Sequence, residues 1–88
     1  QAFDLVKALL WERADWKKVA ALTVEMEESG EEPEKLRRLI LACAKTEVRK
    51  GTKLSPRGYL ILVAFESNWF DSGYAGLVRA CWEVVSQK

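Results

Sequence analysis

The chain has 88 residues, which is the size of one small domain with a modest core. Its 14 Lys and Arg residues nearly balance its 13 Asp and Glu residues, and no run of cations is longer than two, so it lacks the clustered charge of a nucleic-acid-binding surface. The sequence contains no His, which removes the usual acid–base of hydrolytic triads and the commonest neutral ligand of zinc.

Hydropathy argues against a membrane-spanning or secreted protein, and the positions of the two cysteines favour reduced core residues. No window approaches the roughly 18 uninterrupted apolar residues of a membrane-spanning helix, and the N-terminus does not resemble a signal peptide. Cys43 and Cys81 each lie within an apolar helical pattern, so we expect reduced core residues, although two cysteines also allow a disulfide. The chain begins at Gln1 without Met, and residues 1–88 are expected to be a single helical domain, a C-terminal fragment of a longer chain.

The first two helices are predicted from apolar spacing and from their end signals. A helix over 2–13 is indicated by an apolar face that consists of Phe3, Val6, Leu9 and Leu10. Asp15 is a typical N-cap, because its carboxylate can accept a backbone N–H of the following turn. We expect this second helix to end at Ser29 and Gly30, where glycine can take the left-handed conformation.

A third helix is predicted between a proline and a glycine. Pro33 suits the first helical position, where its missing N–H costs no hydrogen bond. The apolar stripe that follows consists of Leu36, Leu39, Ile40, Cys43 and Ala44. Cations occupy the last turns, next to the negative end of the helix dipole, and Gly51 closes the helix.

A fourth helix is predicted to begin at Ser55 and Pro56, a cap followed by proline. The run 59–65 has no polar side, and its periodicity fits a strand equally well. We prefer a helix, because a lone strand among helices has no pairing partner for its backbone groups. A helix that is apolar on all sides is expected to be the central one, enclosed by its neighbours.

The last helix has the strongest amphipathic pattern in the chain, and Asp71 or Ser72 is expected to cap it. Its apolar stripe consists of Tyr74, Leu77, Val78, Cys81, Trp82 and Val85. On this spacing Trp82 is a core residue. The predicted fold class is therefore all-α: a compact five-helix bundle with short connections around a central apolar helix.

Acidic residues crowd around the connection between the second and third helices: Glu25, Glu27, Glu28, Glu31, Glu32 and Glu34. A solvated turn explains this cluster, and no feature of the sequence marks one of these residues as a general acid. The chain has no glycine-rich phosphate loop, and no Ser or Cys has a His partner. We therefore expect no catalytic residue, no bound cofactor and no metal site in this fragment.

The aromatic residues are the remaining distinctive feature, since four Trp, three Phe and two Tyr are a large load for so short a chain. The candidate interface residues are the aromatics near helix ends, namely Trp11, Trp16, Trp69 and Phe70. Trp is enriched at the centres of protein interfaces. We therefore expect the partners to be other protein subunits, in a homo- or hetero-oligomer, with no direct nucleic acid contact and no membrane contact.

Three stretches, which together span essentially the whole chain, carry a family resemblance. Residues 12–19 look like a first hairpin with an acidic-aromatic turn, residues 29–41 are similar to the break before a third helix, and residues 62–81 are similar to a penultimate helix, a break containing glycine and a final helix. In this order they resemble the C-terminal collar domain of clamp-loader subunits, the ring-forming module of the replication factor C and bacterial or phage clamp-loader family.

The resemblance implies that the whole protein is an AAA+ ATPase that loads DNA sliding clamps, with its nucleotide site upstream of Gln1. This fragment would then be a non-catalytic oligomerisation domain that holds subunits in a ring while the ATP-binding modules move. Such a protein would be cytoplasmic, or associated with the nucleoid through its partners. No catalytic residue carries over, because the family's phosphate loop, acidic metal-binding motif and arginine finger are absent from this sequence.

Three other functions remain open. A stand-alone adaptor could bind a peptide or a partner helix in a groove, using the same Trp residues. A DNA-binding domain built on the helix near Ser55 is disfavoured, because a recognition helix must present polar residues to base edges. A small enzyme is disfavoured by the missing His and phosphate loop. Self-association separates the collar from the adaptor: a ring module should form oligomers or require sibling subunits, whereas an adaptor should stay monomeric until its ligand arrives.

Overall fold

Five helices make up most of residues 2–87, the part of the chain that the computed structural model describes. The first joins an α-helical part, α1 (Ala2–Val6), to a π-helical part, η1 (Lys7–Trp11). The others are α2 (Trp16–Glu28), α3 (Pro33–Lys50), α4 (Ser55–Ala64) and α5 (Tyr74–Ser86). No strand occurs in this range, which confirms the all-α five-helix bundle and the helical reading of the apolar run in α4.

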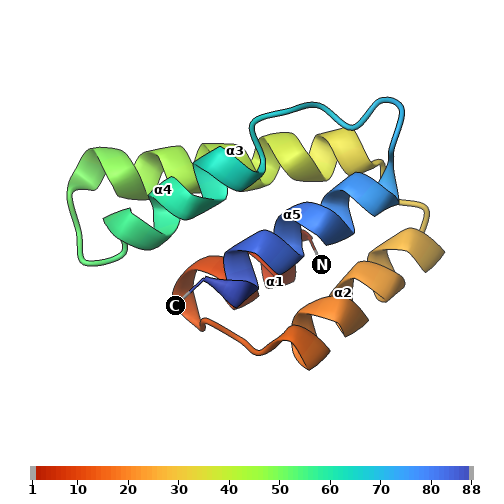
Figure 1. The fold of residues 1–88 in the computed structure, drawn as a ribbon, viewed down its shortest axis with the longest axis horizontal. Helices are drawn as coiled ribbons and strands as arrows, with labels where there is room; N and C mark the ends of the chain where they lie inside the picture. Colours follow the sequence, from red (N-terminus) through yellow and green to blue (C-terminus); the bar gives the residue numbers. More distant parts are fainter. Residues whose placement is uncertain (1, 88) are drawn as a thin grey trace.

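The helices are arranged in two groups that meet along α5 (Figure 1). The hairpin of α3 and α4 lies on one side of α5, with its two helices packed along each other, and α2 lies on the other side. The first helix runs behind α5 and contacts every other helix of the bundle. It is also deeply buried, since Leu5, Val6, Ala8, Leu9 and Leu10 are all inaccessible to solvent.

Several helix ends were correctly predicted because their signals are local. The Asp15 carboxylate accepts a hydrogen bond from the backbone N–H of Lys18 at 3.1 Å, as an N-cap should. Pro33 is the first residue of α3. Gly30 and Gly51 follow α2 and α3 with φ of 78° and 65°, the left-handed conformation that glycine adopts without strain.

Two predicted caps are wrong, because backbone and tertiary contacts replace them. Helix α5 begins after Gly73 with no side-chain cap, so neither Asp71 nor Ser72 fills that role. Ser55 lies inside α4, and its hydroxyl donates to the backbone oxygen of Glu47 at 2.8 Å instead of capping its own helix. This bond ties the start of α4 to the end of α3.

The face that α5 buries differs from the predicted stripe. The residues that point inward are Gly76, Leu77, Ala80, Cys81 and Val84. The small side chains on this face let neighbouring elements approach closely. Trp82 is consequently displaced to the edge of the helix, where it is 51% exposed, so the prediction that it is a core residue is wrong.

Gly76 provides the closest approach on α5, and its replacement by Ala should be destabilising. A Cβ atom there would lie 2.5 Å from Cδ1 of Trp69 and 2.4 Å from Oγ of Ser72. Gly to Ala within a helix ordinarily stabilises by about 0.5–1 kcal/mol, whereas overpacking a core costs roughly 1–3 kcal/mol. We expect urea unfolding of Gly76→Ala to show a net loss. The loss of stability should persist when Gly76→Ala is made in a Ser72→Ala background, because that change relieves only the contact with the hydroxyl. If Gly76→Ala were instead more stable than the wild type, this packing would be contradicted.

Candidate functional site

The four candidate interface residues do not form one surface. Trp11 and Trp16 flank the connection between η1 and α2, whereas Trp69 and Phe70 lie in the connection between α4 and α5. Trp16 packs edge-on against Trp82 in the C-terminal half of α5, with ring centroids 5.1 Å apart. The Trp69–Phe70 segment precedes the N-terminal end of the same helix, so the two pairs lie at opposite ends of α5 (Figure 1).

Trp11 and Trp16 keep part of their rings available at the surface. Trp11 is exposed and contacts Phe3 with ring centroids 5.5 Å apart. Phe3 is itself exposed, which corrects its predicted place in the apolar face of the first helix. Trp16 is half-buried by its contact with Trp82. These paired rings leave a partly exposed aromatic surface at this end of the bundle.

Trp69 and Phe70 are neighbours in sequence with opposite environments. Trp69 is only 3% exposed and packs against Phe65 with ring centroids 5.3 Å apart, so its side chain belongs to the core and is not available to a partner. This corrects the expectation that its ring faces another protein. Phe70 is 71% exposed, and it contributes with Trp69, Pro33 and neighbouring residues to a shallow hollow.

A second exposed apolar feature is on α4, which the sequence predicted to be enclosed on all sides. Ile61 and Ala64 point into the core, but Tyr59 is 60% exposed and Val63 is 47% exposed. The two residues are four positions apart, so they lie on one face of the helix. The prediction that α4 is enclosed on all sides is therefore wrong. Tyr59 and Val63 form an outward ridge that was not predicted from the sequence. An apolar run without polar residues gives no signal of which face is outside.

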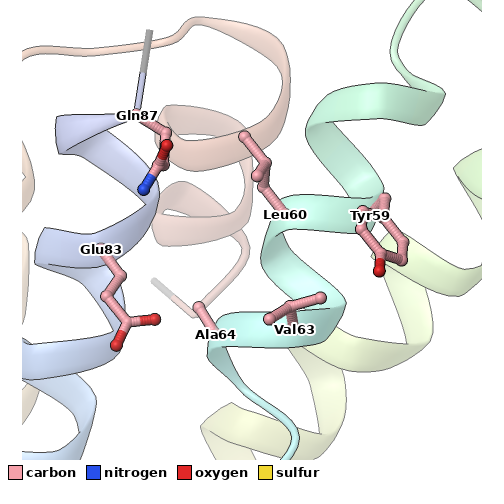
Figure 2. Close-up of a pocket in the computed structure, with 6 residues that line it drawn as sticks. All are labelled: Tyr59, Leu60, Val63, Ala64, Glu83 and Gln87. Atoms are coloured by element: carbon pink, nitrogen blue, oxygen red, sulfur yellow. The ribbon is translucent and has the colours of Figure 1, made fainter.

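A hollow lies beside this ridge, between α4 and α5. Its volume is about 210 Å³, and it is lined by Tyr59, Leu60, Val63, Ala64, Glu83 and Gln87. Figure 2 shows the side chains of α4 on one side of the hollow, with Glu83 of α5 and Gln87, which directly follows α5, on the other. Glu83 forms an ion pair with Arg79 on its own helix. The hollow therefore offers an apolar wall and a polar wall to a group that enters it.

Buried Arg57 fixes the first turn of α4. Its Nε–H donates to the backbone oxygen of Leu9 at 2.8 Å, and its Nη1 donates to that of Val84 at 2.9 Å. Both oxygens belong to the last turns of helices, where backbone carbonyls lack partners within the helix. Burial lowers the pKa of Arg57, and the charge of Arg13 adds to this effect. One guanidinium thus joins α4 to the ends of η1 and α5.

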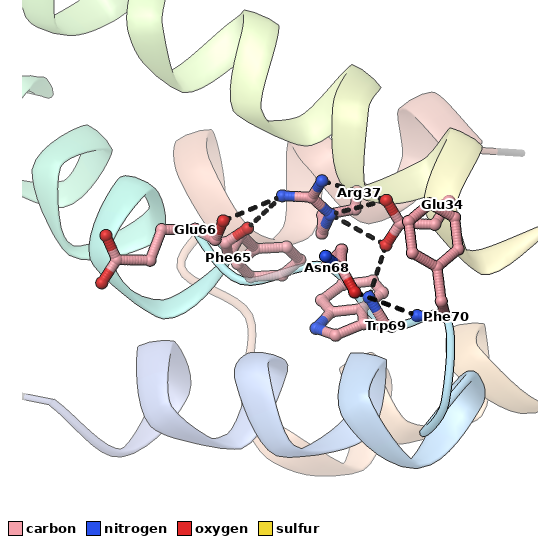
Figure 3. Close-up of polar contacts among 7 residues, drawn as sticks. All are labelled: Glu34, Arg37, Phe65, Glu66, Asn68, Trp69 and Phe70. Atoms are coloured by element: carbon pink, nitrogen blue, oxygen red, sulfur yellow. Dashed lines mark hydrogen bonds and ion pairs between the residues drawn. The ribbon is translucent and has the colours of Figure 1, made fainter.

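A buried ion pair on α3 fixes the other end of α4 (Figure 3). The guanidinium of Arg37 is bound on one side by the carboxylate of Glu34, with an Nε to Oε2 distance of 2.9 Å. On the other side its Nη1 donates to the backbone oxygens of Phe65 at 3.0 Å and Glu66 at 3.1 Å. Glu34 also accepts the backbone N–H of Trp69 at 2.6 Å. The pair therefore holds the chain where it leaves α4.

The acidic cluster that includes Glu34 was predicted to be a solvated turn. Glu34 is buried instead, so that prediction is wrong for this residue. The side-chain hydrogen bond from Arg37 lowers the pKa of Glu34, burial opposes this, and the bond from the Trp69 backbone lowers the pKa further. A carboxyl group in this environment stays ionised and accepts hydrogen bonds. It serves as a structural anchor, since a general acid requires the opposite shift of its pKa.

The cysteines and the possible metal ligands are the other groups of the described residues that could take part in chemistry. Burial raises the pKa of the Cys81 thiol to about 12, so the thiol is protonated and a poor nucleophile. Cys43 and Cys81 are both free, without a disulfide. Residues 2–87 contain no group of three or more His, Cys, Asp or Glu side chains placed to hold a metal ion.

Comparisons of this chain with protein-family models, with curated proteins and with solved structures found no match. None of the helices within residues 2–87 combines the length and the apolar character needed to cross a membrane.

Proposed function

We propose that this chain is a non-catalytic oligomerisation domain that holds protein subunits together through the exposed face of α4. The observation that carries the proposal is the ridge of Tyr59 and Val63 beside the hollow between α4 and α5. A helix without a polar side is stable when its whole surface is covered. This chain covers only part of α4, so a neighbouring subunit that packs on the ridge would complete the burial.

Contact with a partner is energetically more favourable for the ridge of Tyr59 and Val63 than exposure to solvent. Burying apolar surface contributes about 25 cal/mol per Å², and a domain of this size buries a smaller share of its surface than a larger one does. The exposed rings of Trp11 and Phe70, on η1 and in the connection after α4, do not belong to the ridge and could form a contact with a second neighbour. A subunit that contacts two neighbours through different surfaces is the unit from which closed rings are built.

A more specific form of this proposal is the collar of a DNA sliding-clamp loader of the AAA+ type, as the sequence resemblance implies. In that form the domain would be one part of a longer ATPase, acting in the cytoplasm or at the nucleoid through its partners. The alternative is a stand-alone adaptor that binds a partner helix or peptide. The hollow beside α4 favours this alternative, because a groove between two helices can accept an apolar side chain from a third.

Replacement of Val63 by Glu tests the proposal. A carboxylate on the ridge would have to be desolvated at the interface, so association should weaken by about tenfold or more. Sedimentation equilibrium over a concentration series gives the solution mass. We expect the wild-type mass to rise with concentration and that of Val63→Glu to remain that of a monomer.

Val24→Glu is the matched control, because Val24 is the same residue type, is 53% exposed and lies on α2. It should associate as the wild type does. If both variants associate normally, the ridge is not the interface. If the wild type is a monomer at every concentration, self-association is excluded, which favours either the adaptor alternative or an oligomerisation domain that assembles only with different subunits.

A further inference from the structure

The exposed charged residues on the outer face of α3 are all cations. Its exposed cations on this face are Lys35, Arg38, Lys45 and Arg49. The two carboxylates of the helix, Glu34 and Glu47, are both buried and accept hydrogen bonds inside the bundle. Cations and acids are nearly balanced over the whole chain, but the burial of both Glu side chains leaves only cations among the exposed charged residues of this face.

A wide, shallow hollow of about 450 Å³ lies on this side, between α3 and α4. It is lined by Arg38, Leu41, Ala42, Lys45 and Leu62. Its apolar lining comes from both helices, with Leu41 and Ala42 on α3 and Leu62 on α4, and both of its cations belong to α3. Seven residues separate Arg38 from Lys45, which places them on the same face of α3 at about 10.5 Å along its axis. Within residues 2–87 neither cation forms an ion pair.

We infer that this hollow binds an acidic amphipathic helix of a neighbouring subunit. The inference rests on the proposed function and names the chemistry of the partner. Apolar side chains of the incoming helix would cover Leu41 and Leu62, and two carboxylates about two turns apart would meet Arg38 and Lys45. The half-buried leucines distinguish this site from a phosphate-binding surface, because a nucleic acid backbone offers charge but no apolar group that would cover Leu41 and Leu62.

Selection from a library of displayed helical peptides with randomised surface positions tests this inference without assuming a sequence. Selection on the wild-type domain should enrich Asp or Glu at positions two turns apart, on either side of Leu, Met or Phe. Fluorescence anisotropy then measures the affinity of the enriched peptide. The double variant Arg38→Glu/Lys45→Glu should weaken binding by roughly tenfold or more, because two attractive contacts become repulsive.

The matched control is Lys7→Glu/Lys17→Glu, which reverses two exposed cations outside the hollow. This control should bind the peptide as the wild type does, and circular dichroism should show equal helix content in all three proteins. An equal loss of affinity for the peptide in both double variants would show that net charge alone causes the effect, and this would overturn the inference. Enriched peptides without an acidic bias would also overturn it, as would a short DNA duplex that binds the wild type and displaces the peptide.

The result of the peptide-binding test can be distinguished from the result of the association test of the proposed function. If Val63→Glu abolishes association while Arg38→Glu/Lys45→Glu associates and binds peptide normally, the oligomerisation domain stands and the acidic partner is excluded. If the double variant alone loses the peptide, the hollow is a binding site whether or not the ridge of Tyr59 and Val63 is used.

Discussion

Replacement of Arg57 by Lys is expected to lower the free energy of unfolding by about 2–4 kcal/mol, because a single ammonium cannot reproduce the planar fork of the guanidinium. In the wild type that fork reaches the backbone oxygens of Leu9 and Val84 at once. Lysine would keep the buried charge and leave at least one carbonyl without a donor. Urea unfolding followed by circular dichroism measures the loss.

Arg57→Met separates the charge from the hydrogen bonds. Methionine leaves both carbonyls without this donor, but it also removes a cation that is costly to bury. We therefore expect Arg57→Met to be no more destabilising than Arg57→Lys, although it is the less conservative change. Arg49→Lys, at an exposed position of α3, should stay within about 0.5 kcal/mol of the wild type. A similarly small effect of Arg57→Lys would refute the role assigned to the fork.

Replacement of Glu34 by Gln should destabilise the protein near neutral pH by about 2–4 kcal/mol, because it leaves Arg37 largely buried without its counter-charge. The loss should also depend on pH. The pKa of Glu34 is lowered in the folded protein, so the unfolded state binds its proton first on acidification. The stabilisation by Glu34 is therefore complete above about pH 5. It disappears as the pH falls through the lowered pKa.

The measurement is the difference in unfolding free energy between wild type and Glu34→Gln, from urea titrations at several pH values between neutral and acidic. We expect this difference to shrink steadily on the acidic side. Glu28→Gln serves as the comparison, since Glu28 is exposed on α2 and should show little effect at any pH. A difference between wild type and Glu34→Gln that does not change with pH would show that the ionised carboxylate is not the stabilising species.

Features set by neighbouring residues were predicted well from the sequence. The cap at Asp15, the proline at the start of α3 and the glycines after α2 and α3 act over one turn of chain, so local chemistry determines them. The helical state of α4 could also be predicted from the sequence, because a strand without a partner leaves its backbone N–H and C=O groups without hydrogen bonds.

Features set by contacts between distant segments were not predicted. Glu34 occupies the first turn of α3, where an acid is expected for electrostatic reasons alone. It is buried because the chain returns 35 residues later and Trp69 donates its backbone N–H to the carboxylate. The same return buries the Trp69 ring, whose place at a helix end suggested exposure. Sequence spacing describes one helix at a time, and these environments arise where several helices meet.

The candidate surface was missed for a related reason. The run 59–65 is uniformly apolar, so its pattern cannot distinguish a helix buried on all sides from one that is covered only in part. Small residues on α5 had a comparable effect, since Gly76 and Ala80 turn inward and displace Trp82 to the surface. Conversely, two of the four aromatic candidates, Trp11 and Phe70, are exposed, as a contact role would require.

The anchoring of α4 at both ends has a consequence for how fast and how tightly a partner could associate. Arg57 holds its first turn and Arg37 holds its last, each through bonds to backbone oxygens of other segments. A partner would therefore meet a helix whose conformational entropy has already been lost on folding, and little further ordering of its backbone would oppose the contact. Loosening either anchor should reduce affinity even where no contact residue is changed, which makes Arg57 and Arg37 remote determinants of recognition.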